Sequence, residues 1–147
     1  MKTVNKSVLI WYSAQQMYAL VTAIDQYPAF LPWCDRASVV AQTGDTVTAE
    51  IGMAFAGLHH QFTTCNTLTD GQMVRMQLVK GPFSHLQGEW TFLPVADDRS
   101  GACRVSLTLH YGFSNAALSA LVGPVFDRIA NSLVDAFVLR AQQVYGD

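Results

Sequence analysis

Charged residues are scarce in this sequence. Asp, Glu, Lys and Arg make up 14 % of its 147 residues, well below the usual quarter, and the net charge is −2. The arginines are scattered along the chain, at positions 36, 75, 99, 104, 128 and 140. No basic stripe with aromatic neighbours exists, so we expect no DNA partner and no direct RNA-binding surface.

Long apolar runs and paired cysteines are missing as well. No stretch of about 18 apolar residues occurs, and the N-terminus alternates like a strand, so neither a membrane span nor a signal peptide is expected. Cys34, Cys65 and Cys103 are odd in number and lack C-x-x-C spacing, which favours free thiols in a reducing cytoplasm. There is no internal repeat, and the length predicts one domain over residues 1–147.

Catalytic and metal-binding patterns are also lacking. His59 and His60 are adjacent on an expected strand, so their rings point to opposite faces and cannot hold one ion. Cys34 has no histidine near it in sequence, and Asp127 and Asp135 lie on the polar side of an expected helix. We therefore predict no catalytic residues, no metal and no resident cofactor.

What the sequence does have is a series of short strands. Segments rich in β-branched and alternating residues are separated by polar or glycine-containing turns, which favours antiparallel pairing. The expected strands are residues 3–11, 38–42, 46–56, 59–69, 73–80, 85–94 and 103–113. In the 46–56 segment every second residue is apolar, from Val47 to Phe55, so the sheet has one dry face and one wet face.

Two helices accompany these strands. Ser13 and Gln16 have capping-box spacing, which predicts a short helix over residues 14–24. Residues 115–145 form one long helical pattern, in which Pro124 should cause a kink or a restart. The fold class is therefore α+β, with a curved antiparallel sheet of six or seven strands wrapped around the long C-terminal helix.

The stretch DQYPAFLPWCDRA, residues 25–37, is too apolar for an ordinary loop, yet its two prolines exclude one regular helix. One helix cannot fill the concave side of such a sheet, so we expect an elongated apolar cavity between the helix and the sheet, with residues 25–37 as its lid and Phe83 on the facing lip.

Arg140 falls near the apolar side of the last helix, where it could reach the cavity mouth. For any single one of Met53, Phe55, Phe62 and Met76, plain core is favoured roughly two to one over ligand contact, so the cavity is predicted from the whole set. The expected ligand-binding residues are Tyr27, Phe30, Trp33, Met53, Phe55, Phe62, Met76, Phe83, Trp90, Leu109, Tyr111, Phe126, Ile129, Leu133 and Phe137.

Four segments carry a family resemblance: YPAFLPWC at 27–34, FTTCNTL at 62–68, LVKGPFSHLQGEWTF at 78–92 and VFDRIANSLVDAFVLRAQQVYG at 125–146. With them, nearly the whole chain resembles the START-like helix-grip superfamily, which includes polyketide cyclases. Within it, the chain looks like the coenzyme-Q-binding protein family and the related ribosome association toxin family. The resemblance implies a helix-grip fold with a hydrophobic tunnel and brings no strict catalytic motif.

The expected function is non-enzymatic binding and transport of a hydrophobic ligand, for which the resemblance implies a polyprenyl quinone such as ubiquinone. The resemblance implies two alternatives: a ribosome association toxin that binds the large ribosomal subunit and inhibits translation initiation, and a polyketide cyclase-like enzyme. The expected partners are a hydrophobic small molecule and, under the first alternative, the large subunit. Transient contact with a membrane is left open, and the expected location is the cytoplasm.

Overall fold

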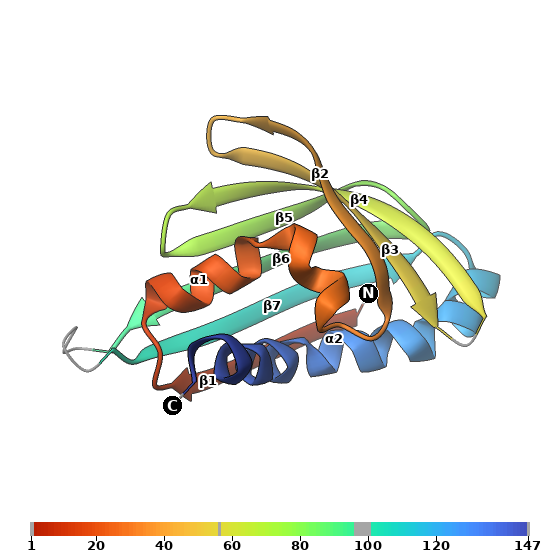
Figure 1. The fold of residues 1–147 in the computed structure, drawn as a ribbon. Helices are drawn as coiled ribbons and strands as arrows, with labels where there is room; N and C mark the ends of the chain where they lie inside the picture. The colour runs from red at the N-terminus through yellow and green to blue at the C-terminus, as the bar shows by residue number, and fades with distance from the viewer. Residues whose placement is uncertain (1, 56, 96–100, 147) are drawn as a thin grey trace.

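The described part of the chain folds into one seven-stranded sheet, two α-helices and a short 3₁₀ helix (Figure 1). The computed structural model describes residues 2–55, 57–95 and 101–146. In chain order the elements are β1 Lys2–Ile10, α1 Ala14–Thr22, η1 Ile24–Ala29, β2 Cys34–Thr43, β3 Thr46–Phe55, β4 Leu58–Thr69, β5 Met73–Lys80, β6 Phe83–Pro94, β7 Cys103–Phe113 and α2 Ala116–Tyr145.

The strand order is β1-β7-β6-β5-β4-β3-β2, and every neighbouring pair is antiparallel. The expected α+β helix-grip architecture is confirmed: Figure 1 shows the sheet curving, with α2 along its lower side and α1 and η1 in front of it. The first and last strands in sequence end up side by side, Lys2 opposite Tyr111 and Ile10 opposite Cys103.

Several expected boundaries were wrong. β2 begins at Cys34 rather than at residue 38, because bulges between Cys34 and Arg36 and between Val39 and Ala41 break the alternation by which a strand is predicted. β6 begins at Phe83 rather than at residue 85, directly after the turn. β1 ends at Ile10, which leaves Trp11 77 % exposed.

The short helix α1 starts as predicted. The Ser13 side chain accepts a hydrogen bond from the Gln16 backbone at 3.0 Å, and the Gln16 side chain accepts one from the Ser13 backbone at 2.8 Å. The helix ends at Thr22 rather than at residue 24, and Ile24 opens η1. The hydroxyl of Tyr27 donates a hydrogen bond to the backbone oxygen of Val21, which fastens η1 to the end of α1.

The long helix α2 begins after Asn115, whose side chain accepts a hydrogen bond from the Leu118 backbone at 2.8 Å. It remains helical through Pro124, and Figure 1 shows its first turns, in light blue, set at an angle to the rest. By length and composition α2 could cross a membrane, a test that core helices also pass. Here Phe126, Ile129 and Phe137 are buried in the core of the domain.

Candidate functional site

Two hollows adjoin α2, and they share part of their walls. The inner cavity, about 100 Å³, lies between the concave face of the sheet, η1 and α2. The outer groove, about 640 Å³, lies at the surface between residues 29–33 and one stripe of α2 from Val125 to Gln143. Leu31, Trp33 and Ile129 line both, so these side chains form the wall between the two spaces.

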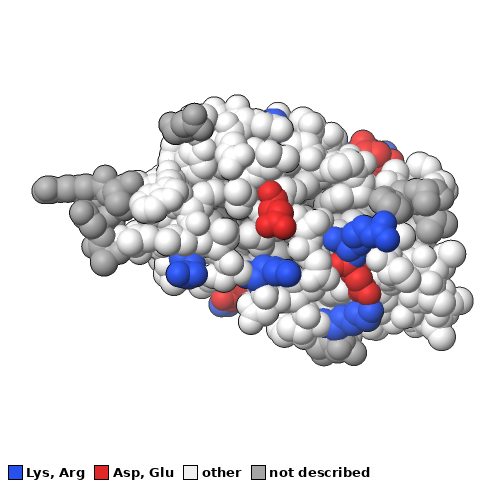
Figure 2. All heavy atoms as spheres, turned by 90° about the horizontal axis from the view of Figure 1, so that it is seen from below, with Lys and Arg blue, Asp and Glu red and all other residues white. Residues whose placement is uncertain are grey.

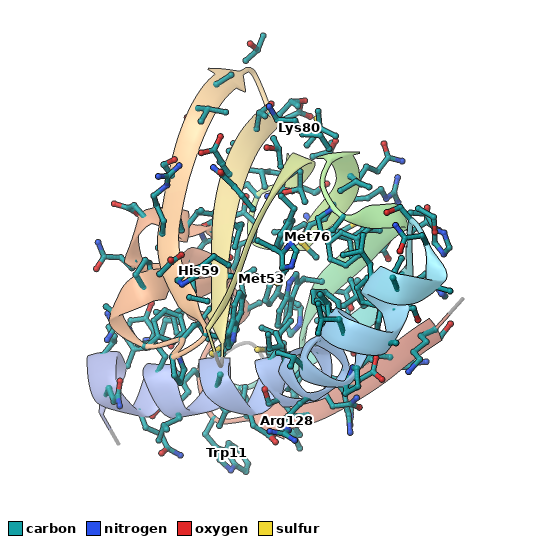
Figure 3. All side chains as sticks on the ribbon, turned by 90° about the vertical axis from the view of Figure 1, so that its right-hand side faces the viewer. Trp11, Met53, His59, Met76, Lys80 and Arg128 are labelled. Atoms are coloured by element: carbon teal, nitrogen blue, oxygen red, sulfur yellow. The ribbon has the colours of Figure 1, made fainter. Side chains whose placement is uncertain are left out.

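Most of the residues expected to bind a ligand do surround this inner cavity. They come from η1 and the following loop, four strands and α2, which shows that the topology brings them together from distant parts of the chain. In Figure 3, Met76 lies among the packed side chains on the concave side of the sheet. The expected residues that line the cavity are Tyr27, Trp33, Phe62, Met76, Trp90, Leu109, Phe126, Ile129, Leu133 and Phe137.

The other expected residues lie elsewhere. Phe30 lines the outer groove, where its ring packs against Phe137 at 5.2 Å. Phe83 is not on a lip: it is 5 % exposed and packs its ring 4.9 Å from Phe126, because β6 begins with it. Tyr111 is buried outside the cavity and its hydroxyl donates to Asp127 at 2.5 Å.

Met53 is 6 % exposed but borders a different surface hollow, formed with Asp35, Gly52 and His60. Phe55 is the last residue of β3, and its side chain lies outside the part of the chain that the structure describes. Met53 and Phe55 were both predicted to line the cavity because they continue the alternation of Val47, Ala49 and Ile51. The strand face was correct for Met53, but the cavity ends before that residue.

Sequence reasoning missed several residues that line the cavity: Ile24, Leu31, Ala49, Ile51, Thr64, Asn66 and Leu86. The signal for two of them was available, since Thr64 and Asn66 follow Phe62 at every second position of β4. Both are buried, at 5 % and 6 % exposed. The sequence analysis did not include them in the cavity lining because they are polar.

The cavity is almost wholly apolar in character. Among the described residues that line it, Tyr27 is the one with an ionisable side chain, and burial raises the pKa of its hydroxyl, which is already committed to the Val21 oxygen. One polar atom is left over. The Oδ1 atom of Asn66 is buried and has no hydrogen-bond partner among the described residues, a situation that costs about 1–3 kcal/mol.

The outer groove differs in character from the inner cavity. Its floor is apolar, but Arg128, Asp135 and Arg140 stand along it. The Arg140 guanidinium lies 5.0 Å from the centre of the Phe30 ring, a cation–π arrangement at the groove wall. The volume of the outer groove is within the range of about 300–1,000 Å³ that accommodates drug-sized ligands. The inner cavity is smaller than the roughly 150 Å³ space known to hold benzene.

Among the described residues, the two buried cysteines are not activated as nucleophiles and no cluster of metal ligands occurs. Burial raises the pKa of the Cys34 thiol to about 11 and that of Cys103 to about 11, so both stay protonated at neutral pH. All three cysteines are free. Within residues 2–55, 57–95 and 101–146, no three His, Cys, Asp or Glu side chains cluster in a way that could hold a metal ion.

The charged residues on the face that carries α2 do not form a single-sign patch. Figure 2 shows blue and red groups interspersed there. Lys2 on β1 pairs with Asp127 on α2, next to Arg128. Figure 3 places Arg128 at the outer surface, away from the packed interior.

Comparison with known proteins identifies a family, sequence relatives and similar structures. The family described as polyketide cyclase / dehydrase and lipid transport matches residues 10–138. The ribosome association toxin RatA of Vibrio cholerae is 40 % identical over 147 residues, which is all of both chains. The mitochondrial coenzyme Q-binding protein COQ10 homolog B of Xenopus laevis is 27 % identical over 143 residues, covering 97 % of this chain and 59 % of that protein. A START superfamily protein from Mycobacterium smegmatis superimposes with a TM-score of 0.80 at 16 % identity, covering 97 % and 98 % of the two chains.

Proposed function

We propose a function for this chain on one premise: it belongs to the polyketide cyclase / dehydrase and lipid transport family. The proposal is that it binds and carries an apolar ligand without transforming it. One observation supports this above others: an apolar inner cavity shares Leu31, Trp33 and Ile129 with a larger surface groove. A long, narrow ligand could occupy both spaces once these side chains shift.

The energetics set the length of such a ligand. Burying apolar carbon contributes about 0.8 kcal/mol per CH₂. Micromolar binding needs about 8 kcal/mol net, and association itself costs about 4–15 kcal/mol. A chain of about 15 to 30 buried carbons meets both terms. A polyprenyl tail of several isoprene units has this length, and the coenzyme Q-binding relative supports a quinone as its head.

Lipid extraction followed by mass spectrometry tests this proposal. The purified protein should retain a polyprenyl or similar long-chain lipid, and Ile129→Gln should lose it, because Ile129 is 5 % exposed and lines both spaces. Leu121→Gln is a matched control, since Leu121 is on the same helix and 57 % exposed. Circular dichroism verifies that both variants fold. Protein that carries no lipid and binds none on titration would refute the carrier function.

A second candidate function is association with ribosomes. The relative named for it is 40 % identical over both whole chains, against 27 % for the coenzyme Q-binding relative, so the comparisons favour this role over the carrier role. We propose that the docking surface includes the end of the sheet that carries Lys80, which is exposed at the end of β5 and is labelled in Figure 3. The two functions are compatible if the ligand controls docking.

Co-sedimentation with large ribosomal subunits tests the second function. The wild-type protein should pellet with the subunit at physiological salt, and Lys80→Glu should not. Lys6→Glu is the matched control. Lys6 is also an exposed lysine, but it lies on β1, an edge strand that β7 and β6 separate from β5. Absence of pelleting by the wild type would remove the ribosomal role, and equal loss in both variants would indicate nonspecific charge attraction.

A cyclase-like activity has less support. The family description includes cyclases, but the cavity offers Tyr27 alone as an ionisable group among the described lining residues, and its proton is engaged. We propose no catalytic residue and no resident cofactor. A cytoplasmic location belongs to the same proposal, supported by bacterial relatives and three free thiols. Transient membrane contact, for loading a lipid, would use exposed apolar residues such as Leu139 and Val144 of α2.

A further inference from the structure

Asn66 stands out among the residues that line the inner cavity. It lies in β4, where its backbone neighbours are Val47 of β3 and Met76 of β5. Neither neighbour has a side chain that can hydrogen-bond strongly to an amide. The residue is 6 % exposed, and its Oδ1 atom is buried with no hydrogen-bond partner in the described part of the chain.

An unpaired amide is an unusual way to line an apolar space. Asparagine is depleted from strands, and a buried polar group without a partner destabilises the fold. An apolar residue of similar size would suit this position better if packing were its only role. The amide is therefore free to bind something that enters the cavity.

The surroundings limit the charge of that ligand. The described cavity lining includes no Lys, Arg, His, Asp or Glu, so an ionised carboxylate or phosphate would be buried without a counter-charge. The hydroxyl of Tyr27 donates to Val21 and cannot donate to a ligand at the same time. What fits is a neutral group that donates a hydrogen bond to Oδ1.

We propose that Asn66 is the polar anchor of the ligand site, and that it selects an apolar molecule ending in a neutral hydroxyl. The ligand hydroxyl enters first and donates a hydrogen bond to Oδ1 of Asn66. The amide nitrogen of Asn66 can in turn donate a hydrogen bond to the oxygen of that hydroxyl. The tail then passes Leu31, Trp33 and Ile129 into the outer groove. This orientation is the reverse of a head group held at the mouth, and it rests on the proposed carrier function.

The size of the space agrees with this orientation. About 100 Å³ accommodates a hydroxyl with a few carbons, while the bulk of the ligand needs the 640 Å³ of the outer groove. A hydroxyl on an aromatic ring needs more room, which Met76 can provide because its unbranched side chain adapts easily. For a quinone, this predicts preference for the reduced form, whose ring bears hydroxyls, over the oxidised form, whose ring bears only acceptors.

Two probes that differ by one methyl group test the anchor: 1-decanol and decyl methyl ether, titrated against the full chain by tryptophan fluorescence. The ether has no proton to donate to Oδ1. We expect the wild type to bind the alcohol about tenfold more tightly than the ether, the effect of one buried hydrogen bond. Decanoate at neutral pH should bind more weakly than either.

Variants then locate the effect. In Asn66→Leu the ratio of alcohol to ether affinity should fall to within about twofold, because the amide is gone while apolar contacts remain. Thr67→Leu is the matched control on the same strand, where Thr67 is exposed, and it should retain the wild-type ratio. Asn66→Leu should melt at the same or a higher temperature. If that variant does not fold, the wild-type ratio still decides.

The outcomes separate this inference from the carrier function. Equal wild-type affinity for alcohol and ether would overturn the anchor and leave the carrier function standing. A ratio that survives in Asn66→Leu would also overturn the anchor. No binding of either probe would refute both. A preference that disappears only with Asn66 supports both.

Discussion

Gly88 has no side chain at a point where two walls of the inner cavity meet. It lies in β6, opposite Met76 of β5 and Leu109 of β7, and both of these line the cavity. A Cβ atom built at Gly88 would be 2.8 Å from Met76 Cε and 2.9 Å from Leu109 Cδ1. Gly88→Ala should therefore push the ends of both side chains aside, and the space open to them is the cavity.

The size of the effect on binding follows from the room lost. Space for about one or two methylene groups disappears, at about 0.8 kcal/mol each. We expect apolar ligands to bind about fourfold to fifteenfold more weakly. The net cost in stability is about 0 to 2.5 kcal/mol, because overpacking costs about 1–3 kcal/mol while replacing glycine in a strand gains about 0.5–1 kcal/mol. The melting temperature should fall by no more than about 8 °C.

Ligand titration by tryptophan fluorescence and thermal denaturation by circular dichroism measure the two effects. Gly52→Ala is the matched control: it is the same substitution in β3, but its Cβ would meet the Asp35 carboxylate on the outer side of the sheet. Unchanged ligand affinity in a folded Gly88→Ala protein would refute the reasoning that places the ligand in the inner cavity. A loss of similar size in both variants would refute it as well.

Three further predictions follow from single residues. Trp33→Phe should lose most of the fluorescence change on ligand binding, because Trp33 borders both spaces; an unchanged signal would assign it to the other two tryptophans. Ser13→Ala should lower the free energy of unfolding by about 1 kcal/mol in urea denaturation, through loss of the α1 cap, with no change in ligand affinity. Burial alone would raise the pKa of Asp127, but hydrogen bonds from Lys2 and Tyr111 outweigh it and lower the pKa. Asp127 thus stabilises the fold above the ordinary pKa of an aspartate, and the stability advantage over Asp127→Asn should vanish as pH falls through the lowered value.

The parts of the fold that could be predicted are those determined by a local sequence pattern, such as the spacing of apolar residues. Alternation in β3 and β7 identified the dry face, since successive strand residues point to opposite sides. The capping box at Ser13 located the start of α1. The helical pattern from residue 115 predicted the length of α2, and among the described elements that helix alone is long enough to lie across the sheet.

The parts that escaped are those that depend on tertiary contacts. Phe83 follows a glycine and a proline, and that sequence predicts an exposed turn. In the structure Gly81 sits so close to Phe62 that an added Cβ would be 2.6 Å from the Phe62 Cβ, which brings the chain straight back into the sheet. Phe83 therefore enters the core and packs its ring 5.6 Å from that of Phe62.

Asn66 shows why the most informative residue of the site was overlooked. A polar residue in an alternating strand is assigned to the wet face, and that rule holds where polarity and burial agree. In β4 they disagree, because Thr64 and Asn66 keep the inward phase that Phe62 begins. Polar residues that hold the phase of an apolar set are thus candidates for ligand contacts. Their burial costs stability, and a ligand that completes their hydrogen bonds recovers that cost only while it is bound. The same disagreement between pattern and polarity can be sought in any strand that faces a cavity, before a structure exists.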